Sequence, residues 1–272
     1  MSDLQPIDKI NAFYEIDGAR FVPTPFTRGP WSPVHQHAGP PAALLARAAA
    51  ALEADPAVRV ARLTFDILRP VPVRPLTLRC DMLTRGRIAE RVAASLWDGD
   101  KEVMRALVLR LRTEAVELEP RPNGLDAPRP PEEAAEMDLP IMSGDVGYHK
   151  AVAIRLEHGA IGSGRARAWL RPSIDLVAGE PMTPLEGALV CADAGSGVSQ
   201  ALDVRRWSFV NADLTVHLQR PPEGGWVCLD ARTVLGRDGT AMAETRLWDT
   251  AGAFGLAEQM LVVRPVDARG RP

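Results

Sequence analysis

The two halves of the chain repeat one another, and this repeat limits the possible folds more than any other feature. Arg69-Pro70 recurs as Arg220-Pro221, and Leu96-Trp97-Asp98 recurs as Leu247-Trp248-Asp249, both at a spacing of 151 residues (220 − 69 and 248 − 97). A shared alternation of apolar residues would often match by chance, but two identical motifs at one spacing would not. We therefore expect two copies of one structural unit.

The first half reads as a short strand over residues 19–22, one helix and then four strands. Pro40 and Pro41 are placed to begin a helix, and residues 42–52 are almost uniformly apolar, which is typical of a helix buried on all sides. Apolar and polar residues then alternate over 61–67, and this period of two indicates a half-buried strand. Three similar segments follow, so we expect the first unit to span residues 1–113.

The second half repeats this order, with a helix that begins near residue 183. Its expected strands lie at 150–157, 162–171, 207–219, 225–235, 240–249 and 254–264. Residues 114–147, by contrast, are rich in proline and charge and show no periodicity, which indicates a linker. The sequence therefore predicts an α+β fold of two tandem units, residues 1–113 and 148–272.

Composition excludes several classes of protein. The 272 residues carry a net charge of −3 with both signs interspersed, so nothing favours binding to nucleic acid or to an anionic membrane. The three cysteines, Cys80, Cys191 and Cys228, are far apart and show no metal-ligand spacing. There is no apolar run of about 18 residues, and residues 1–8 do not resemble a signal peptide. We expect a reduced, cytoplasmic protein without a metal site.

The segment 183–203 is expected to be the enclosed helix of the second unit. Thr183 can cap it, Pro184 suits its first turn, and most of its side chains are small. Asp193 is the one carboxylate in its middle. Burial of an unpaired carboxylate costs several kcal/mol, so Asp193 should have partners or a chemical task. A cap or a buried hydrogen-bond anchor is the alternative.

Longer motifs in both halves are similar to those of one family. They are Phe21-Val-Pro-Thr-Pro-Phe-Thr-Arg-Gly-Pro-Trp31, His35-Gln-His-Ala-Gly-Pro-Pro-Ala-Ala-Leu-Leu-Ala-Arg-Ala48, Leu68-Arg-Pro-Val-Pro72, Trp207-Ser-Phe-Val-Asn-Ala-Asp-Leu-Thr-Val-His-Leu-Gln-Arg-Pro221 and Ala257-Glu-Gln-Met-Leu261. Together they resemble the thioesterase-like superfamily, and within it the proteins of the acyl-CoA thioesterase II type. The resemblance implies a double hotdog, in which each of two tandem units is a buried helix wrapped by an antiparallel sheet.

The resemblance also implies a reaction. Members of this family hydrolyse acyl-CoA thioesters to the free acid and CoA with an activated water, and they use no metal or other cofactor. An Asp of the second helix, a Thr or Ser, and a Gln orient that water. Asp193 and Gln259 match the Asp and the Gln, whereas Asn211 stands at the hydroxyl position. An Asn amide can hold a water but cannot relay a proton as a hydroxyl can.

The residue chemistry is compatible with such a reaction. A thioester carbonyl is already electrophilic, so its hydrolysis needs a placed water, a base such as a buried carboxylate, and donors for the oxyanion. Backbone N–H groups near Gly39, at the start of the first helix, or in the turn before Gly187 are candidate donors; a tight turn is the alternative for Gly39. His37 and Gln36 precede the same helix and are expected to contact the substrate; a role in the loop is the alternative for His37. For Gln259 and Asn211 the alternative is a hydrogen bond to a neighbouring loop.

Two other functions remain open at this stage. One is a non-catalytic protein that binds acyl-CoA or an acyl carrier, with Asn211 as the mark of lost chemistry. The other is a hydratase or dehydratase on the same fold, which ranks lowest because no histidine stands near Asp193 in the sequence. Because isolated hotdogs leave open sheet edges, we also expect a homodimer or a higher homo-oligomer.

Overall fold

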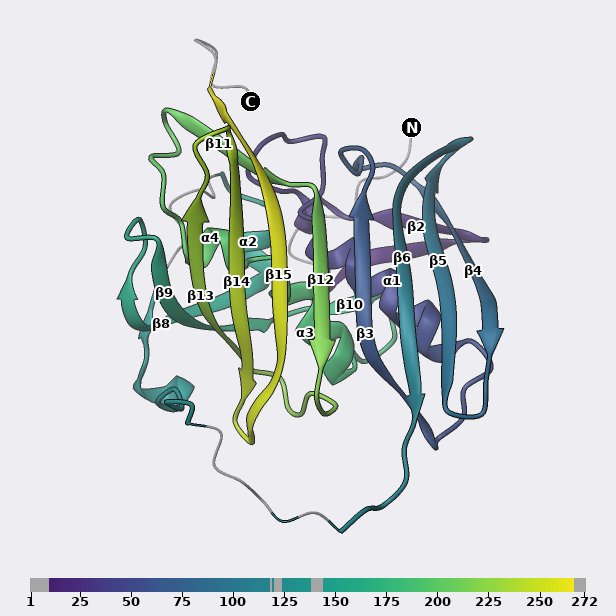
Figure 1. Ribbon diagram of the computed structural model, residues 1–272. Helices are drawn as coiled ribbons and strands as arrows, with labels where there is room; N and C mark the ends of the chain where they lie inside the picture. Colours follow the sequence, from purple (N-terminus) through teal and green to yellow (C-terminus); the bar gives the residue numbers. More distant parts are fainter. Residues whose placement is uncertain (1–9, 118, 120–123, 138–143, 267–272) are drawn as a thin grey trace.

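The strands of both units join in one sheet that wraps around two helices (Figure 1). The computed structural model describes residues 10–117, 119, 124–137 and 144–266. Part of the expected linker and both ends of the chain therefore lie outside the described residues. The first unit contains β1 (Ala12–Asp17), β2 (Arg20–Pro23), the 3-10 turn η2 (Pro25–Thr27), α1 (Gly39–Ala51), β3 (Val58–Ile67), β4 (Leu76–Arg85), β5 (Ala89–Asp98) and β6 (Lys101–Arg112).

The second unit has the same core with additions at each end. Its elements are η3 (Pro131–Glu133), β7 (Ala135–Glu136), α2 (Tyr148–Ala151), β8 (Val152–Ala160), β9 (Arg165–Pro172), β10 (Asp175–Val177), α3 (Pro184–Ala192), α4 (Gly195–Val198), β11 (Trp207–Asn211), β12 (Asp213–Leu218), β13 (Val227–Leu235), β14 (Thr240–Asp249) and β15 (Gly252–Pro265). The expected single helix over 183–203 is wrong, since α3 ends at Ala192 and a separate short α4 follows. Gly195 begins α4 and lies close to Thr245, where a Cβ atom would overlap the Thr245 hydroxyl.

The two units meet through β3 and β12, which lie side by side in the middle of the sheet (Figure 1). Thr64 pairs with Thr215, its own counterpart 151 residues later, and Leu63 and Phe65 pair with Val216 and Leu214. A pair of equivalent residues facing each other across antiparallel strands marks a local twofold axis. The chain is thus arranged like an isologous dimer whose two subunits have been fused.

The repeat extends to an irregularity in the sheet. The pairing of β5 with β6 shifts register between Leu96 and Trp97, and the pairing of β14 with β15 shifts between Leu247 and Trp248. These are the Leu-Trp-Asp motifs, and both bulges stand just before a tight turn. Because β-bulges re-aim the strand locally, the recurrence of one at the same offset confirms the duplication of structure.

The helices α1 and α3 pack against each other on the concave side of the sheet (Figure 1). Small residues make this contact close: a Cβ atom added to Gly39 would overlap the carbonyl oxygen of Val190. The first turn of α1 is buried, and Leu44 and Leu45 contribute to the main core. The position of the loop before α1 relative to α3 is therefore set by backbone contact.

Replacement of Gly39 and of Gly187 by alanine should have opposite effects. Gly39→Ala is expected to destabilise the protein by about 1–3 kcal/mol, because backbone atoms of α3 must move away. Gly187→Ala in α3 meets only the Met182 sulfur at 3.6 Å, an ordinary contact. It should stabilise the helix by about 0.5–1 kcal/mol. Urea unfolding of both variants tests this, and equal effects would contradict the close approach of the helices.

Part of the proline-rich segment packs on the second unit. The carbonyl of Arg129 accepts a hydrogen bond from the indole of Trp169 at 2.8 Å, and the Arg129 guanidinium contacts Glu157 at 3.1 Å. Two residues farther on, η3 begins, and β7 then pairs with β8. Residues 125–137 thus cover β8 and β9 and contribute to the second unit, although they were expected to be linker.

The described sheet leaves little open edge. Its strand order is β10-β1-β2-β4-β5-β6-β3-β12-β15-β14-β13-β9-β8-β7, and β11 also pairs with β15. The strand at one end, β10, has three residues and joins β1 of the first unit in parallel, and β7 at the other end has two residues. Within the described chain, open sheet edges therefore give little reason for two copies to associate. The homo-oligomer stays a prediction. None of the helices in the described ranges has the length and hydrophobicity of a membrane span.

Candidate active site

The carboxylate of Asp193 lies at the end of α3, where it is 5% exposed. A complete capping box starts this helix: the Thr183 hydroxyl accepts from the N–H of Glu186, and the Thr183 N–H donates to the Glu186 carboxylate. The helix ends at Ala192, so Asp193 is its C-terminal cap residue. The cap position turns the carboxylate out of the helix and toward the sheet strands β11 and β15.

Three side chains surround this carboxylate. Asn211 of β11 donates its Nδ2 hydrogen to Oδ1 of Asp193 at 2.5 Å, and Gln259 of β15 donates to the same oxygen at 3.1 Å. The Nδ1 atom of His37, from the loop before α1, lies 3.0 Å from Oδ2. A carboxylate offers about four acceptor positions. One position is therefore left for a water molecule.

Gln259 is fixed on both sides of its amide. Besides bonding the carboxylate, its Nε2 donates to the backbone carbonyl of Asp193 at 3.0 Å, and its Oε1 accepts from the N–H of Ser196 at 3.1 Å. The side chain is 2% exposed. Both amide hydrogens serve Asp193, so the geometry makes Gln259 an orienting residue for the carboxylate and gives it no hydrogen for a water.

The pairing of His37 with Asp193 is the feature that the sequence interpretation missed. The His37 ring stacks on Tyr148 at 3.8 Å with 7° between the planes, and the Tyr148 hydroxyl donates to the carbonyl of Val190 at 2.9 Å. Burial raises the pKa of this hydroxyl well above its ordinary value, so it remains a donor. No histidine stands near Asp193 in the sequence, but the fold brings His37 into contact with it. The available signal was the position of His37 just before a helix that packs on α3.

Gly39 contributes a backbone donor to the same place. Its N–H lies 3.2 Å from Nδ1 of His37. That nitrogen cannot both accept this hydrogen and donate one to Asp193. When the carboxylate is ionised, donation to Asp193 frees the Gly39 N–H. Since Pro40 and Pro41 have no N–H, Gly39 carries the only amide hydrogen among the first three residues of α1.

Gln36 is placed differently from its expected role. Its Oε1 accepts from the Tyr14 hydroxyl at 2.5 Å, and its Nε2 donates to the carbonyl of Pro72 at 2.7 Å. Both polar ends of the amide are thus engaged in the interior, and they tie the loop before α1 to β1 and to the segment after β3. Gln36 thus fixes this loop. The structure does not support its predicted contact with substrate, because both the oxygen and the nitrogen of its amide are already hydrogen-bonded.

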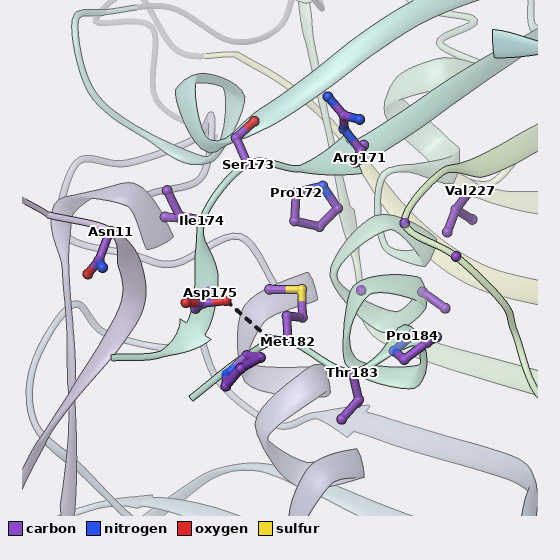
Figure 2. Close-up of a pocket in the computed structure, with 15 residues that line it drawn as sticks. Asn11, Arg171, Pro172, Ser173, Ile174, Asp175, Met182, Thr183, Pro184 and Val227 are labelled. Atoms are coloured by element: carbon purple, nitrogen blue, oxygen red, sulfur yellow. Dashed lines mark hydrogen bonds between the residues drawn. The ribbon is translucent and has the colours of Figure 1, made fainter. Parts of the chain in front are cut away.

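A cavity of about 420 Å³ opens at the other end of α3 (Figure 2). Asp175, Met182, Thr183 and Arg171 are among the residues that line it, and Figure 2 shows their side chains. Thr183 precedes Asp193 by ten residues, or roughly 15 Å along a helix. None of its lining residues contacts the Asp193 carboxylate, so this cavity is separate from the polar group above. Within the described ranges, no cluster of three or more His, Cys, Asp or Glu residues could hold a metal ion.

Two family models match the chain along most of its length. The acyl-CoA thioesterase N-terminal domain matches residues 27–111, and the acyl-CoA thioesterase C-terminal domain matches residues 125–263. The chain belongs to the acyl-CoA thioesterase family. This membership confirms the resemblance seen in the sequence motifs, and it supports thioester hydrolysis as the kind of reaction. Among curated proteins, none matches the sequence.

Solved structures of similar proteins share the fold. A proposed thioesterase II from Thermobifida fusca has a TM-score of 0.72 at 20% identity, covering 94% of this chain and 97% of that one. A hot dog protein of unknown function from Alicyclobacillus acidocaldarius has a TM-score of 0.72 at 15% identity, covering 92% and 94%. An acyl-CoA thioesterase II from Mycobacterium marinum has a TM-score of 0.61 at 13% identity, covering 84% and 88%. The α+β double hotdog predicted for this acyl-CoA thioesterase family member is confirmed.

Proposed function

We propose that the protein hydrolyses acyl-CoA thioesters to the free acid and CoA, with Asp193 as the general base. The observation that supports this most is the carboxylate itself, which is buried, held by Asn211, Gln259 and His37, and left with one acceptor position. A carboxylate fixed in this way can bind a water in one orientation. Neither a metal nor an organic cofactor takes part in the proposed reaction.

The water would lie between Asp193 and Asn211. The Oδ1 atom of Asn211 has no hydrogen-bond partner among the described residues, so it can accept one hydrogen of the water while Asp193 accepts the other. Asp193 takes a proton as the water oxygen bonds to the thioester carbon. The C–S bond then breaks, and the same proton passes to the leaving thiolate. Because an Asn amide cannot relay a proton, Asp193 has to perform both transfers.

The developing oxyanion would be stabilised from the first unit. The Gly39 N–H stands at the N-terminus of α1, where the helix carries partial positive charge. His37 lies between this donor and Asp193. The base comes from the second unit and the oxyanion donor from the first. A single site therefore uses both halves of the duplicated chain.

The His37–Asp193 pair also favours a second candidate function, the hydration of a 2-enoyl-CoA. That reaction adds water across a double bond and releases no thiol. A third candidate remains a protein that binds acyl-CoA without turning it over. All three cysteines are free, which supports a reducing cytoplasm as the location.

An assay with two readouts separates these candidates. The protein is incubated with a panel of saturated acyl-CoAs and with crotonyl-CoA, and free thiol and the absorbance of the conjugated thioester are followed together. Thiol release from the saturated substrates is expected. Loss of the conjugated absorbance without thiol would instead establish hydration, and binding without either change would establish the non-catalytic alternative.

A further inference from the structure

A separate apolar cluster lies beside the Asp193 site. Phe209, Ala241, Ala243 and Leu261 form a buried cluster apart from the main core. In the register of the sheet, Ala243 faces Gln259 and Ala241 faces Leu261. Phe209 and Leu261 are thus each two residues from one of the two amides, on the same face of their strands. The cluster begins where the polar site ends.

The cluster encloses a small cavity. Leu202, Phe209, Ala241 and Leu261 line it, together with Ser196, whose N–H bonds Gln259. We call the space between these residues the acyl pocket. Its volume is about 10 Å³, enough for about one water molecule. Its walls are apolar apart from Ser196 and Thr233, and Ser196 connects it to the Gln259 amide, so an apolar group attached to a carbonyl carbon would fit between the polar site and this cavity.

The first unit carries a different pair at the equivalent place. The facing residues Ala241 and Leu261 correspond, 151 residues earlier, to Glu90 and Arg110, which also face each other. Glu90 and Arg110 are buried and form an ion pair. The position that Ala241 and Leu261 occupy in the second unit is thus occupied by a charged pair in the first.

The polar site shows the reverse exchange. Asn211 and Gln259 correspond to Val60 and Val108, both of them buried in the core of the first unit. Two differences therefore separate the units at the same place: amides replace valines, and an apolar pocket replaces an ion pair. The amides hold the Asp193 carboxylate, and the apolar pocket leaves room beside it for an apolar group; neither difference is needed for packing alone.

Leu202 is an apolar wall of the acyl pocket that lies outside the sheet. It lies in the segment between α4 and β11, and it is only partly buried. The neighbouring Gln200 is 7% exposed, and its Oε1 has no hydrogen-bond partner in the described part of the chain. The Nε2 atom of the same Gln200 donates to the backbone carbonyl of Leu202 at 3.0 Å. A side-chain hydrogen bond, and no pairing within the sheet, thus holds Leu202 against the pocket.

We propose that the acyl pocket receives the acyl chain of the substrate and that Leu202 closes its far end, so that the enzyme selects short acyl groups such as acetyl and propionyl. This rests on the proposed function. Each further methylene that had to displace Leu202 would lose its burial, which is worth about fourfold in binding. Longer chains should therefore react more slowly.

Two variants test the pocket in opposite directions. Leu202→Ala should raise the ratio of kcat/KM for octanoyl-CoA to that for acetyl-CoA by about tenfold or more, because the end of the pocket opens. Ala241→Val should lower kcat/KM for propionyl-CoA relative to acetyl-CoA by about tenfold, because two methyl groups fill the space. Met242→Leu is the matched control, since Met242 follows Ala241 on the same strand but is 36% exposed. It should leave both ratios unchanged.

Binding keeps this test separate from the test of the reaction. The affinities of thioether analogues of acetyl-CoA and octanoyl-CoA, which cannot be hydrolysed, are measured by calorimetry for the same variants. If wild type releases thiol but neither variant shifts its ratio, the acyl pocket is wrong and the proposed function stands. If wild type is inert but Leu202→Ala still favours the longer analogue, the pocket stands and hydrolysis falls. A folded Ala241→Val variant that favours longer chains would also overturn the pocket.

Discussion

Asp193→Asn is expected to lower kcat/KM for acyl-CoA hydrolysis by about 10²–10⁴ while leaving the fold intact. The amide oxygen that replaces Oδ1 can still accept from Asn211 and Gln259, so the local structure is kept. The amide cannot take a proton from water at neutral pH, so general-base assistance is lost. Thiol release from the best substrate of the panel measures the effect, and circular dichroism with thermal unfolding confirms the fold.

A matched control is available ten residues farther along. Asp203→Asn removes a carboxylate that is 39% exposed and paired with Arg205 on the surface. It should retain the wild-type rate, because that carboxylate touches none of the site residues. Undiminished turnover by Asp193→Asn would refute Asp193 as the base. Equal losses in both variants would point to a general effect of charge instead.

Much of the fold could be predicted because local pattern and duplication agree. The alternation over 61–67 places Leu63 and Phe65 on one face, and the offset of 151 places their counterparts on the same face of the second unit. Asp193 could also be singled out, because a carboxylate among small apolar residues needs partners. These inferences use only local periodicity and the cost of burying charge.

Other features depend on contacts that the sequence does not encode locally. His37 and Asp193 are 156 residues apart (193 − 37), and they meet only because Gly39 lets α1 approach the backbone of α3. The packing of α4 on β14 likewise depends on Gly195, where a Cβ atom would overlap the Thr245 hydroxyl. Gln36 was expected at the substrate, but a buried hydroxyl on β1 claims its amide. In each case a tertiary contact decides what the side chain can do.

Arg110→Leu is expected to destabilise the protein by about 3–5 kcal/mol, because it leaves the buried Glu90 without its main partner. Arg110 also donates to the carbonyls of Ala49 and Leu52, so its loss removes hydrogen bonds at the C-terminal end of α1. The surface pair of Arg105 with Glu102 provides the comparison: Arg105→Leu should cost at most about 1 kcal/mol. Urea unfolding of both variants measures the difference.

The double variant Glu90→Ala plus Arg110→Leu places in the first unit the two residues that the second unit carries, Ala241 and Leu261. Its loss of unfolding free energy should be smaller than the summed losses of the two single variants by about 1–3 kcal/mol, because no charge remains buried alone. Its thioesterase activity should equal that of wild type, since Val60 and Val108 still stand where a second site would need amides. Additive losses would show that the pair contributes no coupling. A gain of activity in the first unit would show that the ion pair alone keeps that unit from binding substrate.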